Sequence, residues 1–331
     1  MTKLAKIFGI LLIAFCLPAN GQRVRYTISP KNAETVLHKE NVRATVDYLT
    51  APSLGGRATG SDGARRSALW LESRFRDLSL EPLGGSWMHG FRISSELFGR
   101  NVLGLIPGSG APARYVIVMA HYDNLGTLGG TFYPGADSNA SGVAALLELG
   151  RMFRHMADCK KSYGTGLILV ALDGKEKDLC GAADLWRLLS GGKLLDPVSG
   201  SPVQIDQIAL VVNLDQMGAT LSPLSTGRPD YLMMLSEEGS SRRSTLEKVN
   251  REQGIGLQLG YDYYGSKDFT NLFFRRISDQ RVFLEHGIPS VMFTSGITLN
   301  NNKPYDDADS LDYDILCRRI RLIFYWLDKV L

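Results

Sequence analysis

Short apolar runs alternate with segments of helical periodicity along most of this chain, and this alternation is the strongest constraint on its fold. Uninterrupted apolar runs are typical of strands that are buried on both faces of a sheet. The segments between them carry apolar residues three or four positions apart, which is the spacing of one helix face. We therefore predict an α/β fold: a three-layer single domain with a mostly parallel, mixed central sheet and helices on both faces.

The individual elements follow from the same patterns. The predicted strands are Asn101–Ile106, Tyr115–Ala120, Leu167–Leu172, Ile208–Leu214, Tyr231–Leu235 and the run "GIPSVMFTS". The predicted helices are Asn32–Thr50, Asp62–Leu80, Asn139–Met156, a segment after Asp178, Ser241–Gln253 and Asp312–Val330.

The N-terminal segment "MTKLAKIFGILLIAFCLPANGQ" reads as an export signal. Two lysines precede a short apolar run, and small residues follow at the spacing that a signal peptidase needs. We predict a signal peptide over residues 1–21, cleavage before Gln22, and a single domain over 22–331. A membrane anchor is the alternative, but the run falls short of the about 20 residues that a span needs. A lipid anchor on Cys16 is disfavoured by the bulky Phe15 before it.

Composition excludes some classes of function. The 331 residues include 37 basic and 34 acidic side chains, a net charge of +3, without a basic tract. Nucleic acid is therefore a poor candidate partner. Outside the export segment only Cys159, Cys180 and Cys317 remain, too few for a disulfide framework. One disulfide could form after export, and the sequence does not specify the pair or the oligomeric state.

Chemically versatile side chains follow successive predicted strands. His121 and Asp123 end one strand, Glu176 follows the next, Asp215 follows a third, and Asp137 leads into a helix. In open α/β sheets, ligands bind beyond the carboxyl ends of the strands. Imidazole and carboxylates are ligands for zinc, and two residues on one strand face could let Asp123 orient the His121 ring. A bridging carboxylate would allow a two-metal hydrolytic site.

Each of these residues also has an ordinary structural interpretation. His121 could be a hydrogen-bonded histidine under a loop, Asp137 could cap the following helix, and Asp215 could close a turn. Their convergence on one sheet edge is what favours the metal site.

With these residues in this order, the chain resembles a known family, the family-twenty-eight metallopeptidases. This family includes secreted zinc aminopeptidases, glutaminyl cyclases, glutamate carboxypeptidase and the non-catalytic transferrin receptor ectodomain. The resemblance covers nearly all of the chain after the export segment. The motifs occur in the expected order: "LGGRATGSDGARRSALWLESRFRDLSLEPLGG", "NVLGLIPGS", "AHYDNLG", "GADSNASGVAALLELGRMF", "VALDGKE", "NLDQMG", "SDQRVF", "HGIPSVMF" and "KPYDDADSLDYDIL".

The resemblance implies a role for each matching position. His121, Asp137 and Asp215 would hold one zinc ion, with Asp137 bridging to a second. Asp137, Glu176 and a histidine near the C-terminus would hold that second ion. A glutamate directly before Glu176 would be the general base, and Asp279 would lie near the substrate.

The chain departs from the family at several of these positions. Lys175 stands where the general base should be, and Asn302 stands at the position of the C-terminal ligand histidine. Gln280 replaces the histidine of a Ser-Asp-His motif, and Ser138 replaces an aspartate beside the bridging position. His286 lies in an apolar run, where we expect it to pack or cap a helix.

These substitutions weaken the site in different ways. A charged lysine repels metal ions and cannot accept a proton, although a neutral lysine could act as a base. The set Asp137, Glu176 and Asn302 offers only oxygen, which suits Mg²⁺ or Ca²⁺ better than zinc. Lys175 could instead pair with Glu176 or Asp137 in place of the missing metal.

Three functions remain open from the sequence. The first is an exported aminopeptidase that uses one retained zinc ion at His121, Asp137 and Asp215. The second is a non-catalytic member that binds a peptide or protein partner. The third and weakest is glutaminyl cyclisation, because in this family that chemistry uses the site that contains the missing histidine.

Overall fold

The computed structural model describes residues 28–111, 113–219, 228–237, 241–263 and 265–331. The predicted signal peptide, residues 1–21, lies outside them. Across these described ranges, no helix has both the length and the apolarity to cross a membrane.

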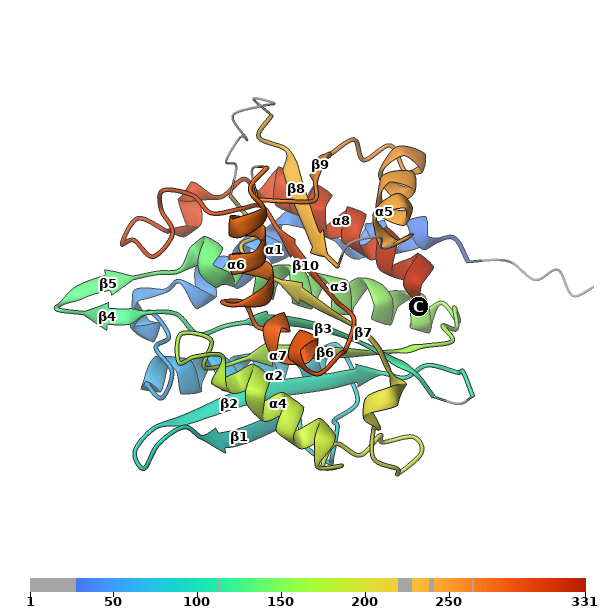
Figure 1. The fold of residues 1–331 in the computed structure, drawn as a ribbon, viewed down its shortest axis with the longest axis horizontal. Coiled ribbons are helices and arrows are strands. Elements are labelled where there is room, and N and C mark those ends of the chain that lie inside the picture. Colours follow the sequence, from blue (N-terminus) through green and yellow to red (C-terminus); the bar gives the residue numbers. More distant parts are fainter. Residues whose placement is uncertain (1–27, 112, 220–227, 238–240, 264) are drawn as a thin grey trace, which may run out of the picture.

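A mixed, eight-stranded sheet forms the centre of the molecule, in the order β1-β2-β6-β3-β7-β10-β8-β9 (Figure 1). The strands β6, β3, β7 and β10 run parallel, so their carboxyl ends meet at one edge. Strands β1, β2 and β8 are joined to this group in antiparallel pairs. The bounds are β1 Met88–Arg92, β2 Phe98–Ile106, β3 Tyr115–His121, β6 Gly166–Leu172, β7 Ile208–Leu214, β8 Tyr231–Ser236, β9 Gln258–Gly260 and β10 Ser290–Thr294. A small hairpin, β4 (Gly126–Leu128) and β5 (Thr131–Tyr133), projects from the rest (Figure 1).

Both faces of the sheet are buried, which explains why the strands read as continuous apolar runs. Alternate residues of β3 enter two separate cores: Val116, Val118 and Ala120 in the first, Tyr115, Ile117 and Met119 in the second. The first core contains residues of α1 (Lys39–Leu49), α2 (Asp62–Asp77), α3 (Ser141–Asp158), α5 (Ser241–Glu252) and α8 (Tyr313–Val330). The opposite face carries α4 (Cys180–Ser190), α6 (Lys267–Arg275) and α7 (Gln280–Glu285). The predicted α/β architecture with helices on both faces is thus confirmed.

Some predicted elements differ in their bounds. The helix expected over Asn32–Thr50 is divided into a 3₁₀ segment, η1 (Pro30–Val36), and α1. The break occurs because Leu37 and His38 have extended backbone conformations. The helix expected from Asn139 begins instead as a short π-helical turn, η3 (Ala136–Ala140), which leads into α3. Strands β1, β4, β5 and β9 and helices α6 and α7 were not expected from the sequence, because each is short.

The buried guanidinium of Arg57 connects several segments at the carboxyl edge of the sheet. The side chain is 0% exposed. Its Nε donates to the Tyr122 carbonyl at 2.7 Å, and its Nη2 donates to the Gly135 carbonyl at 2.9 Å. Its Nη1 donates to the carbonyls of Pro134 and Leu49. One side chain therefore ties together the end of α1, the residue after β3 and the loop that enters η3.

We expect Arg57→Met to lower the free energy of unfolding by at least about 3 kcal/mol, because several buried carbonyls lose their donors at about 1–3 kcal/mol each. Chemical denaturation of both proteins measures this loss. The matched control is Arg65→Met, whose guanidinium forms an exposed ion pair with Asp62. The control should cost less than about 1 kcal/mol. Equal losses for the two variants would contradict the role assigned to Arg57.

Candidate functional site

The parallel strands bring most of the singled-out residues to one edge of the sheet. His121 is the last residue of β3, and Asp215 directly follows β7. Lys175 and Glu176 lie in the turn after β6, and Asp279 is the N-cap residue of α7. The order of the strands, rather than proximity in sequence, creates this group.

The carboxylate of Asp123 holds the turn after β6 in place. Its Oδ1 accepts a hydrogen bond from the Lys175 backbone N–H at 3.1 Å, and its Oδ2 accepts one from the Glu176 N–H at 3.0 Å. The Thr59 hydroxyl donates to Oδ2 at 3.1 Å. Burial would raise the pKa of Asp123, but its contacts with His121 and these two amides hold it below the usual value. An ionised Asp123 therefore fixes the backbone that carries Lys175 and Glu176.

The ring of His121 is fully buried and lies between two carboxylates. Its Nδ1 is 3.0 Å from the backbone oxygen of Asp123 and 3.6 Å from the Asp123 Oδ1. Its Nε2 lies 3.6 Å from Asp215 Oδ1 and has no hydrogen-bond partner among the described residues. Burial lowers the pKa of His121, but Asp123 and Asp215 outweigh burial and raise it to about 10. The two carboxylates therefore favour the protonated form of the imidazole.

The ammonium of Lys175 is paired within the site. Its Nζ donates to Glu176 Oε1 at 2.7 Å, and each of these side chains is 20% exposed. Burial lowers the pKa of Lys175, but the carboxylates of Asp215, Glu176 and Asp279 outweigh it and raise the pKa above its usual value. Lys175 is therefore a fixed positive charge that cannot take a proton from water.

The carboxylate of Asp137 belongs to a different network. Its Oδ1 accepts hydrogen bonds from the Gly218 N–H at 2.7 Å and from the Ser141 hydroxyl at 3.0 Å. The Asp137 N–H in turn donates to Asp306 Oδ1 at 2.8 Å. Burial and the nearby Asp306 raise the pKa of Asp137 to about 7. Asp137 therefore connects the start of α3 with the segment after β7.

Comparison with known proteins identifies the family. Residues 101–327 match the model of "Peptidase family M28". The chain belongs to peptidase family M28. A relative in Pyrenophora tritici-repentis, described as a "Probable zinc metalloprotease", is 24% identical over 343 residues, which cover 91% of this chain and 74% of the relative.

Solved structures show the same fold at lower identity. The zinc aminopeptidase BSAP of Bacillus subtilis superimposes with a TM-score of 0.68 at 14% identity, over 88% of this chain and 95% of BSAP. The glutaminyl cyclase of Porphyromonas gingivalis gives a TM-score of 0.64 at 17% identity, over 89% of this chain and 99% of the cyclase. The resemblance to the M28 fold noted from the motifs is thus confirmed.

The residues present do not fit the two-zinc centre that the M28 resemblance implies. Within the described part of the chain, no three or more His, Cys, Asp or Glu side chains form a group that could hold a metal ion. His121 Nε2 and Asp215 Oδ1 face one another, but Asp137 bonds elsewhere and Glu176 is paired with Lys175. Zinc sites in proteins use three or four protein ligands. The ligand roles assigned from the M28 motifs therefore stay predictions.

The substituted M28 positions near the C-terminus have structural contacts of their own. Asn302 is exposed in the loop after β10, at a left-handed φ of 57°. Its neighbour Asn301 accepts a hydrogen bond from Gln216 Nε2 at 2.6 Å, beside Asp215. No motif or spacing in the sequence predicts this hydrogen bond between Gln216 and Asn301. Gln280 is buried, and its Oε1 accepts a hydrogen bond from Asn213 at 2.8 Å.

His286 stands apart from the M28 site. Its ring stacks on Trp186 with the centroids 3.9 Å apart, and its Nδ1 is 2.7 Å from the Val282 carbonyl oxygen. This is the packing role expected from the sequence.

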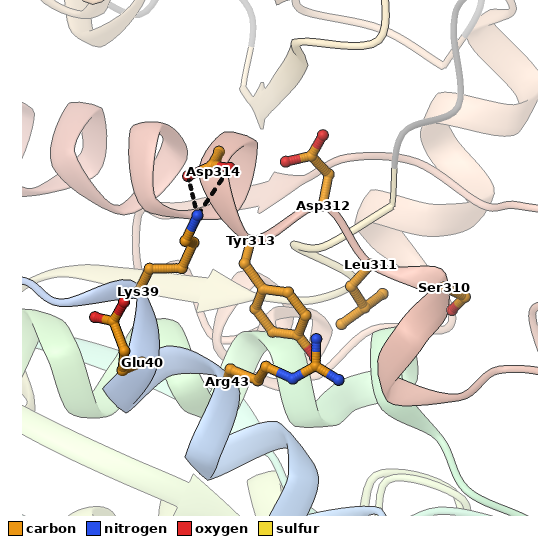
Figure 2. A pocket seen from close by; sticks show the side chains of 8 residues that line it. All are labelled: Lys39, Glu40, Arg43, Ser310, Leu311, Asp312, Tyr313 and Asp314. Carbon is orange, nitrogen blue, oxygen red and sulfur yellow. Dashed lines mark hydrogen bonds and ion pairs between the residues drawn. The ribbon is translucent and has the colours of Figure 1, made fainter.

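Two surface pockets share Ser310 and Leu311 in their lining. The first, between α1 and the start of α8, contains none of the predicted site residues and holds a Lys39–Asp314 ion pair at 2.9 Å (Figure 2). The second is lined by Asp137, Ala219, Thr298, Leu299, Asn300, Asp306, Ser310 and Leu311. Of the two, the second is the one that contains a predicted site residue, Asp137.

Asp279 is fully buried, and neither of its carboxylate oxygens has a hydrogen-bond partner among the described residues. Burial, together with the charges of Asp215 and Asp123, raises its pKa to about 7, against the opposing effect of His121 and Lys175. The folded protein therefore holds a proton on Asp279 over a range where the unfolded chain has lost it.

Stability should consequently fall as pH rises from about 4 to about 7, by at most about 4 kcal/mol from this group. Asp279→Asn removes the ionisable carboxyl. The free energy of unfolding of the variant, measured relative to that of the wild type, should therefore be higher at pH 8 than at pH 4.5. Thermal unfolding at the two pH values measures the difference. Asp268→Asn, at an exposed position in α6, is the control and should leave the pH profile unchanged. A parallel profile for Asp279→Asn and the wild type would contradict this assignment.

Proposed function

We propose that this M28 chain binds a peptide or protein at the carboxyl edge of its sheet without hydrolysing it. The observation that carries the proposal is the Lys175 ammonium, bonded to Glu176 Oε1 at 2.7 Å where the family resemblance places a general base. General-base catalysis contributes about 10²–10⁴ in rate, and a charged ammonium cannot perform it. The family is a peptidase family, which supports a polypeptide as the ligand class.

The charges around Lys175 add to this argument. The same ammonium is close enough to Asp215 for each to shift the pKa of the other. A positive charge at that place opposes the binding of a zinc ion by the same carboxylates. The lysine at this position therefore removes the general base and also weakens the binding of a metal ion.

A second candidate is an aminopeptidase that retains one zinc ion, as the relatives described as zinc metalloproteases suggest. The observation in its favour is His121 Nε2, which is buried, unpartnered among the described residues and 3.6 Å from Asp215 Oδ1. His121 and Asp215 together offer two ligand atoms, which is fewer than the three or four protein ligands of most zinc sites. We therefore place this candidate second.

One experiment separates the two candidates. The purified protein, with and without added zinc, is incubated with a tryptic digest of a standard protein, and bound peptides are recovered by gel filtration and identified by mass spectrometry. We expect peptides to be recovered at full length, with no product lacking the N-terminal residue. Peptides shortened by one residue in the zinc-loaded sample would contradict the proposal and support the aminopeptidase. An equal mass of serum albumin is the control for peptides that are carried through non-specifically.

We further propose that the chain is exported and that its mature form begins at Gln22, on the basis of the N-terminal segment. In a bacterial host, the protein recovered outside the cytoplasm should begin at Gln22 by N-terminal sequencing. Ala19→Phe should block cleavage, because signal peptidase requires a small residue at that position. Uncleaved wild-type protein in the cytoplasm would contradict this proposal.

A further inference from the structure

The sheet ends at β1, and one side of this strand has no neighbouring strand among the described residues. β1 is the first strand in the sheet order and pairs only with β2 (Figure 1). Just beyond β1, the Ile93 N–H donates to the Leu97 carbonyl at 2.9 Å. Alternate residues of an antiparallel strand bond to the partner strand. Odd-numbered residues of β1 therefore bond to β2, and the N–H and C=O groups of Gly90 and Arg92 point away from it.

One face of the β1–β2 ladder carries two guanidinium groups. In the strand register, Arg92 is opposite Phe98, and Gly90 is opposite Arg100. These four residues share one face, because side chains alternate between the two faces along a strand. The Arg92 guanidinium lies over the Phe98 ring, 5.0 Å from its centroid. Phe98 itself is 42% exposed, so this face is open to a ligand.

The groove above this face is positively charged. It has a volume of about 400 Å³, and no carboxylate side chain belongs to its lining of Gly90, Phe91, Arg92, Phe98, Gly99 and Arg100. Neither guanidinium forms an ion pair with a carboxylate of the described residues. A methyl group at Gly90 would meet no heavy atom within 4 Å. A side chain from an added strand therefore has room to pass over Gly90 and reach both guanidinium groups.

We propose that β1 accepts an extended acidic polypeptide as an additional antiparallel strand, with an acidic side chain opposite Gly90. The added backbone would bond to the outward N–H and C=O groups of Gly90 and Arg92, as in other cases of recognition by strand addition. Its carboxylate would lie between Arg92 and Arg100, and guanidinium groups bind carboxylates through paired hydrogen bonds. This surface contains none of the residues of the carboxyl-edge site, so the inference does not rest on the proposed function.

A second copy of this chain is a poorer partner for the same edge. Antiparallel pairing of two β1 strands would gather the Arg92 and Arg100 side chains of both copies on one face. Like charges that face one another across strands destabilise the pairing. Charged side chains on edge strands oppose self-association in this way. The arginines that exclude a second copy therefore favour an acidic strand.

Fluorescence polarisation with labelled synthetic peptides tests the proposal on the purified chain. The probe is a seven-residue peptide with valine at its second and sixth positions, glutamate at its fourth position and threonine elsewhere. A second peptide carries lysine in place of the glutamate. We expect the glutamate peptide to bind at least about tenfold more tightly, because the lysine would face two guanidinium groups. Equal affinities, or no binding of the glutamate peptide, would overturn the proposal.

Two arginine variants test the assigned side chains. Arg92→Gln and Arg100→Gln should each weaken binding of the glutamate peptide by about tenfold, because each removes charge-assisted hydrogen bonds. The double variant should bind the two peptides alike. Arg251→Gln, at an exposed position in α5, is the matched control and should bind like the wild type. A double variant that still prefers the glutamate peptide would contradict the role of these arginines.

The backbone pairing is tested without altering the protein. A residue of the added strand whose side chain lies on the Arg92 face directs its N–H toward β1. N-methylation of the glutamate should therefore weaken binding by at least about tenfold. N-methylation of the threonine that follows should leave binding unchanged, because that N–H points to solvent. Equal affinities for the two methylated peptides would overturn strand addition.

A different class of partner would also be recognised. Dextran sulfate that binds the wild type but not Arg92→Gln, when the glutamate peptide does not bind, would identify a polysaccharide as the ligand and would overturn the proposal. None of these variants alters Lys175 or Glu176. Shortened peptides in the digest experiment would contradict the proposed function and leave the β1 result standing.

Discussion

The buried Asp123 carboxylate is the interaction on which the rest of the site depends. It receives two backbone N–H groups from the turn after β6, while its own residue follows the end of β3. These bonds connect the segments that follow two neighbouring parallel strands, β3 and β6. The backbone hydrogen bonds of the sheet do not extend to these segments. Because a buried carboxylate with well-aligned donors stays ionised, the connection is strong and specific. His121 and Lys175 both take their positions from it.

The same carboxylate fixes a lysine at the carboxyl edge of the sheet in this M28 fold. The parallel strands bring His121, Asp215 and Glu176 to one edge of the sheet. A lysine in the turn fills part of that edge with a positive charge. The ammonium of Lys175 is paired with the carboxylate of Glu176.

The sequence predicted the buried elements well, and the reason is visible in particular residues. The bounds of β7, Ile208–Leu214, agree with the prediction because both of its faces are buried and every position except Asn213 is apolar. Strand β1 was not expected, because it lies at the sheet edge and carries His89, Gly90 and Arg92 among its five residues. The break between η1 and α1 was missed because periodicity does not register the extended backbone at Leu37 and His38.

The sequence by itself determined the family, the order of buried strands and helices, and the presence of a lysine where a base was expected. These features depend on local composition and on the order of motifs along one chain. Only the tertiary structure decided where each carboxylate points. Asp137 stands in a motif that suggests a bridging ligand, yet it bonds to Gly218 and Ser141, and its backbone bonds to Asp306. The direction of a side chain at a strand end is set by contacts with residues far away in the sequence, and residue spacing carries no information about them.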